Sequence, residues 1–218
     1  MHRFYNQFIK TGDLCFDLGA NHGSRTDVFL SLGAKVIAVE PQPECTEELK
    51  EKYEGKNAEV IEAAVSSKHG EGKLYLCNMD EVSTLSEDFK DYYSKYDYLS
   101  WKKSINVKLI TLDELIAKYG VPEFCKIDVE GWESEVMKGL SSPLHYLSYE
   151  FNGPFKVNVI DCIDRLSTLG EVVYNYSFYE SFELESAEWL SAEEMKAKIA
   201  SLPANILHGD IYAEFIRE

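Results

Sequence analysis

The chain has 218 residues, which is about one and a half times the ~150 residues of a typical domain, so we expect a single domain. With 45% hydrophobic and 28% charged residues, its composition excludes a disordered chain, a collagen-like chain and a small disulfide-rich protein. Lys and Arg number 22 against 38 Asp and Glu, and the net charge of -16 repels phosphate backbones and anionic membranes. We therefore expect no nucleic-acid partner.

No stretch approaches the ~20 consecutive apolar residues that cross a bilayer, and the first residues lack the apolar run of a secretory signal. These features predict no membrane insertion and a cytoplasmic location. The five cysteines are odd in number, widely scattered and never spaced CxxC, which argues against a disulfide framework and against a zinc site. They are Cys15, Cys45, Cys77, Cys125 and Cys162.

Short apolar runs alternate with helical patterns along the chain, as expected for a parallel sheet covered by helices on both faces. The expected strands are 14–18, 35–39, 59–65, 72–77, 105–110, 124–129, 144–151, 171–176 and 211–216. Three of the expected helices end at Gly33, Gly55 and Gly120. Three others span 132–140, 157–169 and 191–202. Thr111 with Glu114, and Ser191 with Glu194, form capping boxes at two helix starts.

The segment 78–103 interrupts this alternation. It carries four tyrosines and a tryptophan among many charges, without a clear period of two or of 3.6. Such a stretch in a compact domain is typical of a lid or binding loop, while a solvated surface helix and disorder are the alternatives. We therefore predict one domain over 1–218, with 78–103 as a candidate lid or acceptor-binding insertion.

A turn rich in small residues, Asp17-Leu-Gly19-Ala-Asn21-His-Gly23, lies where the first strand leads into a helix. Small residues let a backbone approach a ligand, and the helix start offers free amides. The spacing is not GxGxxG, and a carboxylate before the first glycine is unfavourable for pyrophosphate but suits a positively charged sulfonium or ammonium. The alternative is a tight turn that binds no ligand.

Glu40 ends the second strand about 20 residues after the first glycine, where an acidic residue can bind a ribose hydroxyl in Rossmann-like folds. Pro41 fixes the chain just beyond it. Because the adjoining group is not expected to be a pyrophosphate, S-adenosylmethionine fits better than NAD. A solvated strand end is the alternative interpretation of Glu40.

The runs FDLGANHGSRTDVFLSLGAKVIAVEPQPE, IEAAVSS, TLDEL, FCKIDVEGWESEVMKGL and LSYEFN, in this order, resemble the FkbM-like family of class I S-adenosylmethionine-dependent methyltransferases over most of 14–152. The resemblance implies an α/β Rossmann-like fold with a mostly parallel seven-stranded sheet and an antiparallel last strand. It also implies O-methylation of a hydroxyl on a sugar, glycan or natural-product small molecule. The expected cofactor-binding residues are Asp17, Gly19, Asn21, His22, Gly23, Glu40, Pro41, Gln42, Ala63, Ala64 and Asp128.

Methyl transfer to a hydroxyl requires that the acceptor be positioned and its proton removed. Asp128 and Glu130 follow one strand and Glu150 stands at the end of the next, so we expect these catalytic candidates to meet in one cleft. Repulsion between carboxylates raises a pKa toward the range of a general base. Helix capping by Asp128 or Glu130 and Mg²⁺ binding are the alternatives, and we predict no metal site.

Three hypotheses follow. The first is a methyltransferase that acts on hydroxyl acceptors. The second is a non-catalytic S-adenosylmethionine-binding subunit. The third is a nicotinamide-dependent oxidoreductase, which lacks the expected GxGxxG loop here. His22 is either a proton acceptor or a loop residue that packs against the cofactor.

Overall fold

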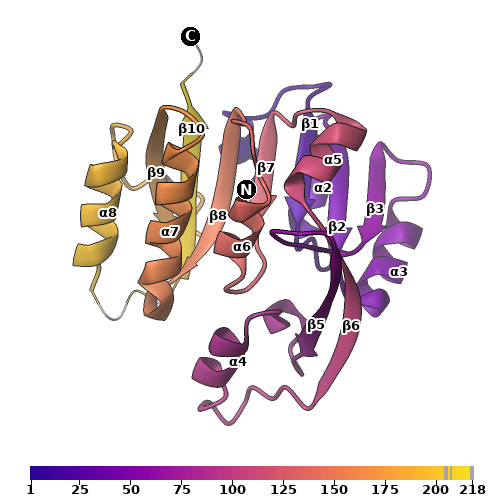
Figure 1. The fold of residues 1–218 in the computed structure, drawn as a ribbon. Helices are drawn as coiled ribbons and strands as arrows, with labels where there is room; N and C mark the ends of the chain where they lie inside the picture. Colours follow the sequence, from indigo (N-terminus) through magenta and orange to yellow (C-terminus); the bar gives the residue numbers. More distant parts are fainter. Residues whose placement is uncertain (204–205, 207, 217–218) are drawn as a thin grey trace.

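The computed structural model describes residues 1–203, 206 and 208–216, which form a seven-stranded sheet with the order β3-β2-β1-β7-β8-β10-β9 and a three-stranded sheet with the order β4-β6-β5 (Figure 1). The strands are β1 (Leu14–Leu18), β2 (Lys35–Glu40), β3 (Ala58–Glu62), β4 (Ala64–Val65), β5 (Gly70–Leu76), β6 (Lys103–Ile110), β7 (Phe124–Ile127), β8 (Tyr146–Asn152), β9 (Val172–Phe178) and β10 (His208–Phe215).

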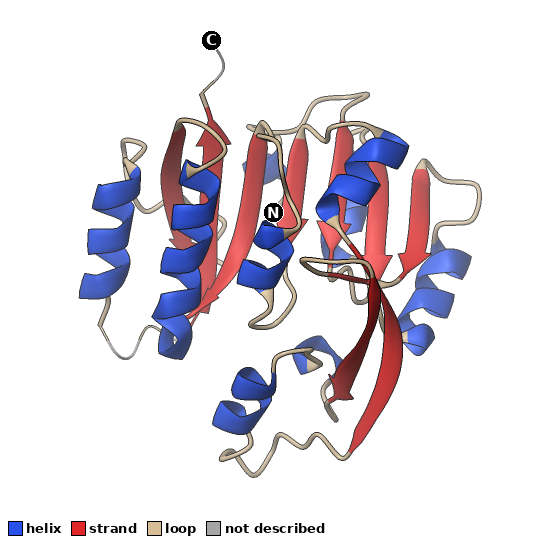
Figure 2. Cartoon of the chain, in the orientation of Figure 1, coloured by secondary structure: helices blue, strands red, loops and turns tan. Residues whose placement is uncertain are grey.

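The helices are α1 (His2–Tyr5), α2 (Ser24–Ser31), α3 (Pro43–Lys52), α4 (Glu87–Tyr93), α5 (Leu112–Tyr119), α6 (Glu133–Lys138), α7 (Lys156–Ser167) and α8 (Ala192–Ser201), with 3-10 turns η1 (Asp80–Val82) and η2 (Gly153–Phe155) (Figure 2). Both predicted capping boxes, at Thr111 and at Ser191, are present. In the part of the chain that the structure describes, we find no helix with the length and apolar character needed to cross a membrane.

The large sheet has the predicted topology. Strands β3, β2, β1, β7 and β8 run parallel to one another, whereas β10 lies antiparallel to both β8 and β9. The prediction of a mostly parallel seven-stranded sheet with an antiparallel last strand is therefore confirmed.

Helices cover both faces of this sheet. Phe16 of β1 faces the larger hydrophobic core, which is built with α5, α6, α7 and α8. Its neighbour Cys15 faces a second core, where Tyr5 of α1 and Phe29 of α2 pack. The side chains of β1 thus alternate between two buried layers, as expected for a central parallel strand. Helix α1 was not predicted, because a four-residue helix is too short to show a period.

The strand predicted over 59–65 is two strands. Residues of β3 pair with β2 in the large sheet, while β4 leaves that sheet and pairs with β6. Strands β5 and β6, predicted over 72–77 and 105–110, form an antiparallel hairpin that projects beyond the large sheet (Figure 1). The period of two in these strands indicates an exposed face but not which sheet each strand joins.

The segment 78–103 contains a helix that the sequence analysis did not assign. Ser86 caps α4 by accepting a hydrogen bond from the backbone N–H of Phe89 at 3.1 Å. Phe89 is buried against Tyr93 and Phe155. Phe89, Tyr92 and Tyr93 have helical spacing, which the intervening charged residues obscure.

Candidate functional site

A cavity runs along the edge of the large sheet where β1, β2 and β7 end. The space in its narrow part is about 490 Å³ and in its open part about 1180 Å³, open solvent included. This is the edge at which open α/β sheets bind ligands. The narrow part is lined mainly by apolar side chains, namely Val39, Pro41, Ala63, Ala64, Val65, Leu74, Leu85, Val129 and Trp132.

Most of the predicted cofactor residues line this cavity. Those in the narrow part are Gly19, Asn21, Glu40, Pro41, Gln42, Ala63, Ala64 and Asp128. Asp17 and His22 line the open part, where Glu130 and Glu150 also lie. Gly23 lines neither part.

Two glycines shape the turn through contacts with protein atoms. Gly19 has φ of +83°, and a Cβ there would lie 1.8 Å from the carbonyl oxygen of Asp128. Gly23 has φ of +80°, and its Cβ would lie 2.1 Å from the hydroxyl of Tyr53. Only a residue without a side chain fits either place, so the glycines let the turn after β7 and helix α3 pack against the loop.

Glu40 connects the ends of β1 and β2. Its Oε2 accepts a hydrogen bond from the backbone N–H of Asn21 at 2.9 Å, and its Oε1 accepts one from the backbone N–H of Gln42 at 2.8 Å. Burial raises the pKa of Glu40, and these backbone donors oppose that rise. A carboxylate offers about four lone-pair sites, so it can accept further bonds from ligand hydroxyls.

A buried charge network lies beneath the open part. Lys126, fully buried on β7, contacts Asp210 Oδ1 at 2.5 Å and Asp128 Oδ2 at 3.2 Å through its Nζ. Burial alone would lower the pKa of Lys126, but Asp128 and Asp210 raise it well above its usual value. Beside it on β1, Asp17 accepts a hydrogen bond from the Thr26 hydroxyl at 2.5 Å, and burial raises the pKa of Asp17. Lys126 therefore holds Asp128 from its buried side.

The structure brings the three catalytic candidates together: one carboxylate oxygen each of Asp128, Glu130 and Glu150 lies within 4.8 Å of the other two. Glu130 has φ of +53°, a left-handed conformation that turns the chain after β7. Burial, followed by neighbouring carboxylates, raises the pKa of Glu130 and of Glu150 well above the usual value. Acids of this kind hold a proton at higher pH and are stronger bases once they lose it.

The strand predicted over 124–129 ends at Ile127, which places Asp128 at the sheet edge. Helix capping does not explain the acids. Trp132 is the N-cap of α6 and makes no side-chain capping bond. It is Glu133 that accepts hydrogen bonds from the N–H groups of Val129 and Gly131, at 3.3 and 3.2 Å. The capping alternative for Asp128 and Glu130 is therefore wrong.

His22 has both ring nitrogens next to carboxylates. Nδ1 lies 2.9 Å from Glu48 Oε2 and Nε2 lies 2.7 Å from Asp80 Oδ2. The hydrogen bond to Asp80 raises the pKa of His22. The ring is half-exposed at the rim of the open part and is hydrogen-bonded to protein groups, which favours the packing role over that of a free proton acceptor.

The sequence analysis missed several residues of the open part, namely Arg25, Glu81, Glu180 and His208. Arg25 donates through Nη2 to both oxygens of Glu180, at 2.6 and 2.8 Å. Two buried nitrogens at this wall, Nδ2 of Asn21 and Nε of Arg25, have no hydrogen-bond partner among the described residues. The position of Arg25, two residues after Gly23, could have indicated a place near the cofactor turn. Glu180 and His208 come from distant segments, so no local pattern could have indicated them.

Comparisons with known proteins agree with this architecture. The model of the methyltransferase FkbM domain matches residues 17–161. Hexuronic acid methyltransferase AglP of Haloferax volcanii is 28% identical over 139 residues, which are 63% of this chain and 54% of that protein. The chain thus spans about half the length of this curated relative.

Among solved structures, the fibrillarin pre-rRNA processing protein of Methanococcus jannaschii has a TM-score of 0.50 and 14% identity, with 97% of this chain and 70% of that chain covered. The fibrillarin of Aeropyrum pernix, solved with bound S-adenosylmethionine, has a TM-score of 0.48 and 14% identity, with 94% and 68% covered. Because the identity is only 14%, the similarity to the Methanococcus jannaschii protein shows a shared fold alone.

Proposed function

Since the chain belongs to the FkbM methyltransferase family, whose cofactor is S-adenosylmethionine, we propose that it transfers the methyl group of this cofactor to a hydroxyl of a sugar, glycan or natural-product small molecule. The observation that carries the proposal is the convergence of Asp128, Glu130 and Glu150 in the open part of the cavity, where Asp128 and Glu130 also border the narrow part.

The residues fit the cofactor. The apolar narrow part suits a flat adenine, and Glu40 has free lone pairs for ribose hydroxyls. The buried Nδ2 of Asn21, which lacks a partner among the described residues, is an available donor for a ligand oxygen. When bound, S-adenosylmethionine supplies an electrophilic methyl group on a sulfonium.

The acids have two roles in this proposal. Their oxygens carry full or partial negative charge, which favours a cationic sulfonium over a neutral thioether. Glu130 in its ionised form, a stronger base because burial raises its pKa, accepts the proton of the acceptor hydroxyl, while Asp128, held by Lys126, orients that hydroxyl. Glu150 accepts a hydrogen bond from the Nδ2 of Asn152 at 3.0 Å and forms the far wall.

The insertion 78–103 is proposed to contact the acceptor. Tyr93 of α4 donates to Asn152 Oδ1 at 3.2 Å, which links the insertion to Glu150 through Asn152. Tyr92 packs edge-on against Phe155, contacts Lys95 Nζ through its ring and is partly exposed. Because Asp80, Ser83 and Leu85 of the insertion also line the narrow part, its deletion is expected to abolish transfer and to weaken cofactor binding as well.

The name of the curated relative supports a sugar acceptor. Acidic side chains outnumber basic ones in the lining of the open part, which disfavours an anionic acceptor. We therefore propose a neutral sugar hydroxyl rather than a hexuronate or a nucleic acid, in line with the net charge of -16. The cytoplasmic location stays a prediction.

Methyl-labelled S-adenosylmethionine, offered with a methyl glucoside or with the matching glucuronoside, tests this proposal. We expect the glucoside to be methylated at least about tenfold faster than the glucuronoside. This ratio corresponds to a difference of roughly 1.4 kcal/mol in free energy. A preference for the glucuronoside would refute the neutral acceptor. Cofactor binding without transfer to any hydroxyl compound would favour the non-catalytic alternative, and family membership already disfavours a nicotinamide-dependent oxidoreductase.

A further inference from the structure

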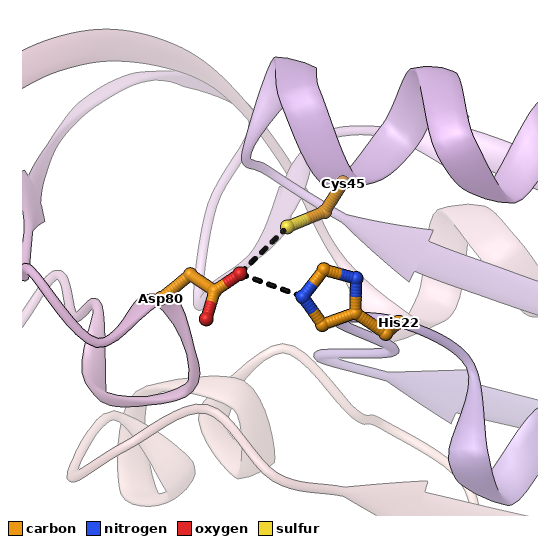
Figure 3. Close-up of side chains that lie close together, drawn as sticks. All are labelled: His22, Cys45 and Asp80. Atoms are coloured by element: carbon orange, nitrogen blue, oxygen red, sulfur yellow. Dashed lines mark hydrogen bonds and ion pairs between the residues drawn. The ribbon is translucent and has the colours of Figure 1, made fainter.

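A nitrogen, a sulfur and an oxygen donor from three separate segments meet beside the cofactor loop (Figure 3). His22 comes from the loop before α2, Cys45 from the first turn of α3, and Asp80 from the start of η1. Donor atoms of the three residues all lie within 4.8 Å of one another. We propose that His22, Cys45 and Asp80 bind one divalent transition-metal ion, with Zn²⁺ as the best match and water as the fourth ligand.

Two of the donor-to-donor distances can be compared with those of a tetrahedral zinc site. Usual Zn–S and Zn–O bond lengths give a sulfur-to-oxygen separation of about 3.6 Å. The Sγ of Cys45 lies 3.8 Å from Asp80 Oδ2. The Nε2 of His22 lies 2.7 Å from the same oxygen, a hydrogen-bond length. The distance between these two atoms has to lengthen by about 0.6 Å when a metal ion takes the place of the proton that they share.

Asp80 is able to make this adjustment. It belongs to a 3-10 turn of three residues, and its side chain is 40% exposed. Cys45, in contrast, is buried on α3 and fixes the position of the sulfur. The cluster therefore combines one rigid ligand with one adaptable ligand.

A second observation points independently to a metal. Histidines that bind metals usually donate the other ring N–H to a carboxylate, which fixes the tautomer. Glu48 Oε2 lies 2.9 Å from Nδ1 of His22 and serves as this acceptor. The lone pair of Nε2 then points at Asp80, on the side where Cys45 lies.

The local charge also favours a cation. Asp80 and Glu48 share one imidazole. A divalent ion compensates these negative groups and lets the thiol of Cys45 bind as thiolate, with its proton released to solvent.

The proposed ion would fix one wall of the cofactor cavity. Gln42 donates through Nε2 to the carbonyl oxygen of Asp80 at 3.0 Å and accepts from the Ser83 hydroxyl at 3.0 Å, so the insertion already contacts the end of β2. A metal bound by Asp80, His22 and Cys45 adds bonds to the β1 loop and to α3. Its role is structural, and it is separate from the carboxylates of Asp128, Glu130 and Glu150.

The test uses the full chain after treatment with EDTA. Calorimetric titration with ZnCl₂ is expected to show one ion per chain bound through the trio, and Co²⁺ is expected to give the thiolate-to-cobalt absorption band in the near ultraviolet. Cys45→Ser should remove the band and weaken Zn²⁺ binding at least about 100-fold, and Glu48→Gln should weaken it about 10- to 100-fold. Cys77→Ser is the matched control, because Cys77 is a half-buried thiol beside the same insertion whose Sγ contacts Asn78 instead.

The carboxylates near Asp128 can also attract a cation, but they give no thiolate band. A wild-type Co²⁺ spectrum without this band, or equal Zn²⁺ affinity in wild type and Cys45→Ser, overturns the proposal. If Cys45→Ser fails to fold, the wild-type spectrum and Glu48→Gln decide. None of these readouts depends on methyl transfer, so failure of the proposed activity would be recognised separately.

Discussion

The two parts of the cavity are built in different ways. The narrow part is formed by backbone turns at the ends of β1, β2 and β7, where Gly19 lets Asp128 approach and Glu40 holds two N–H groups. The open part is formed by charged side chains from segments far apart in the chain, such as Arg25, Glu150 and Glu180. In the proposed function, cofactor binding therefore depends on backbone shape, whereas acceptor chemistry depends on charge.

The largest expected effect lies in the open part. Asp128→Asn and Glu130→Gln should each lower kcat by about 10²- to 10⁴-fold, because a general base and its oriented acceptor are lost. Their affinity for S-adenosylmethionine, measured by calorimetry, should stay within about threefold of wild type, since an amide replaces one carboxylate of several. If both variants turn over at nearly the wild-type rate, catalysis rests on proximity alone or on Glu150.

A second test targets the shape of the narrow part. Gly19→Ala should destabilise the fold by about 3 kcal/mol or more, because the new Cβ meets a carbonyl oxygen in a left-handed backbone. Gly55→Ala is the matched control: Gly55 also has a positive φ, of +72°, but nothing lies within 4 Å of its Cβ position. Urea unfolding compares the two, and equal losses would show that the contact with Asp128 is unimportant.

Glu40→Ala probes the connection between the two turns. Loss of the carboxylate should weaken S-adenosylmethionine binding by about 1 to 3 kcal/mol, the scale of hydrogen bonds to a charged group. Titration calorimetry measures this directly. Glu62→Ala is a suitable control, because Glu62 pairs with Glu40 across β2 and β3, while its half-exposed side chain contacts Lys50. Unchanged affinity in Glu40→Ala would remove Glu40 from the site.

The smallest effect concerns pH. Burial raises the pKa of Glu133 to about 7 from a usual value of 4.5. The folded state then binds more protons than the unfolded state, so this group lowers the free energy of unfolding as pH rises from about 4.5 to 7. Glu133→Gln should flatten this decline by about 1 to 2 kcal/mol in urea unfolding at pH 5 and pH 8. If the free energy of unfolding declines equally in the wild type and in Glu133→Gln, then folding does not raise the pKa of Glu133.

The sequence predicted what local patterns encode. Apolar periodicity indicated the large sheet and its helices, and the ends of β7 and β8 indicated that Asp128, Glu130 and Glu150 would meet. Periodicity could not show that β4 leaves the large sheet, because sheet membership is decided by the pairing partner β6.

Other features depend on contacts between distant segments. His22, Cys45 and Asp80 have no metal-ligand spacing in the sequence, and the tertiary fold alone brings them together. The scattered cysteines argued against a zinc site, an inference that excludes only sites encoded within one short motif. The same holds for Arg25 and Glu180, which are far apart in the chain but form an ion pair at 2.6 Å.

The contact between Lys126 and Asp210 bears on the order of events during synthesis. Asp210 belongs to β10, which inserts between β8 and β9 and is the last described strand to leave the ribosome. Until β10 inserts, Lys126 lacks one of the two carboxylates that stabilise its charge. A nascent chain therefore contains the turns after β1 and β2 well before the charge network beneath the open part is complete.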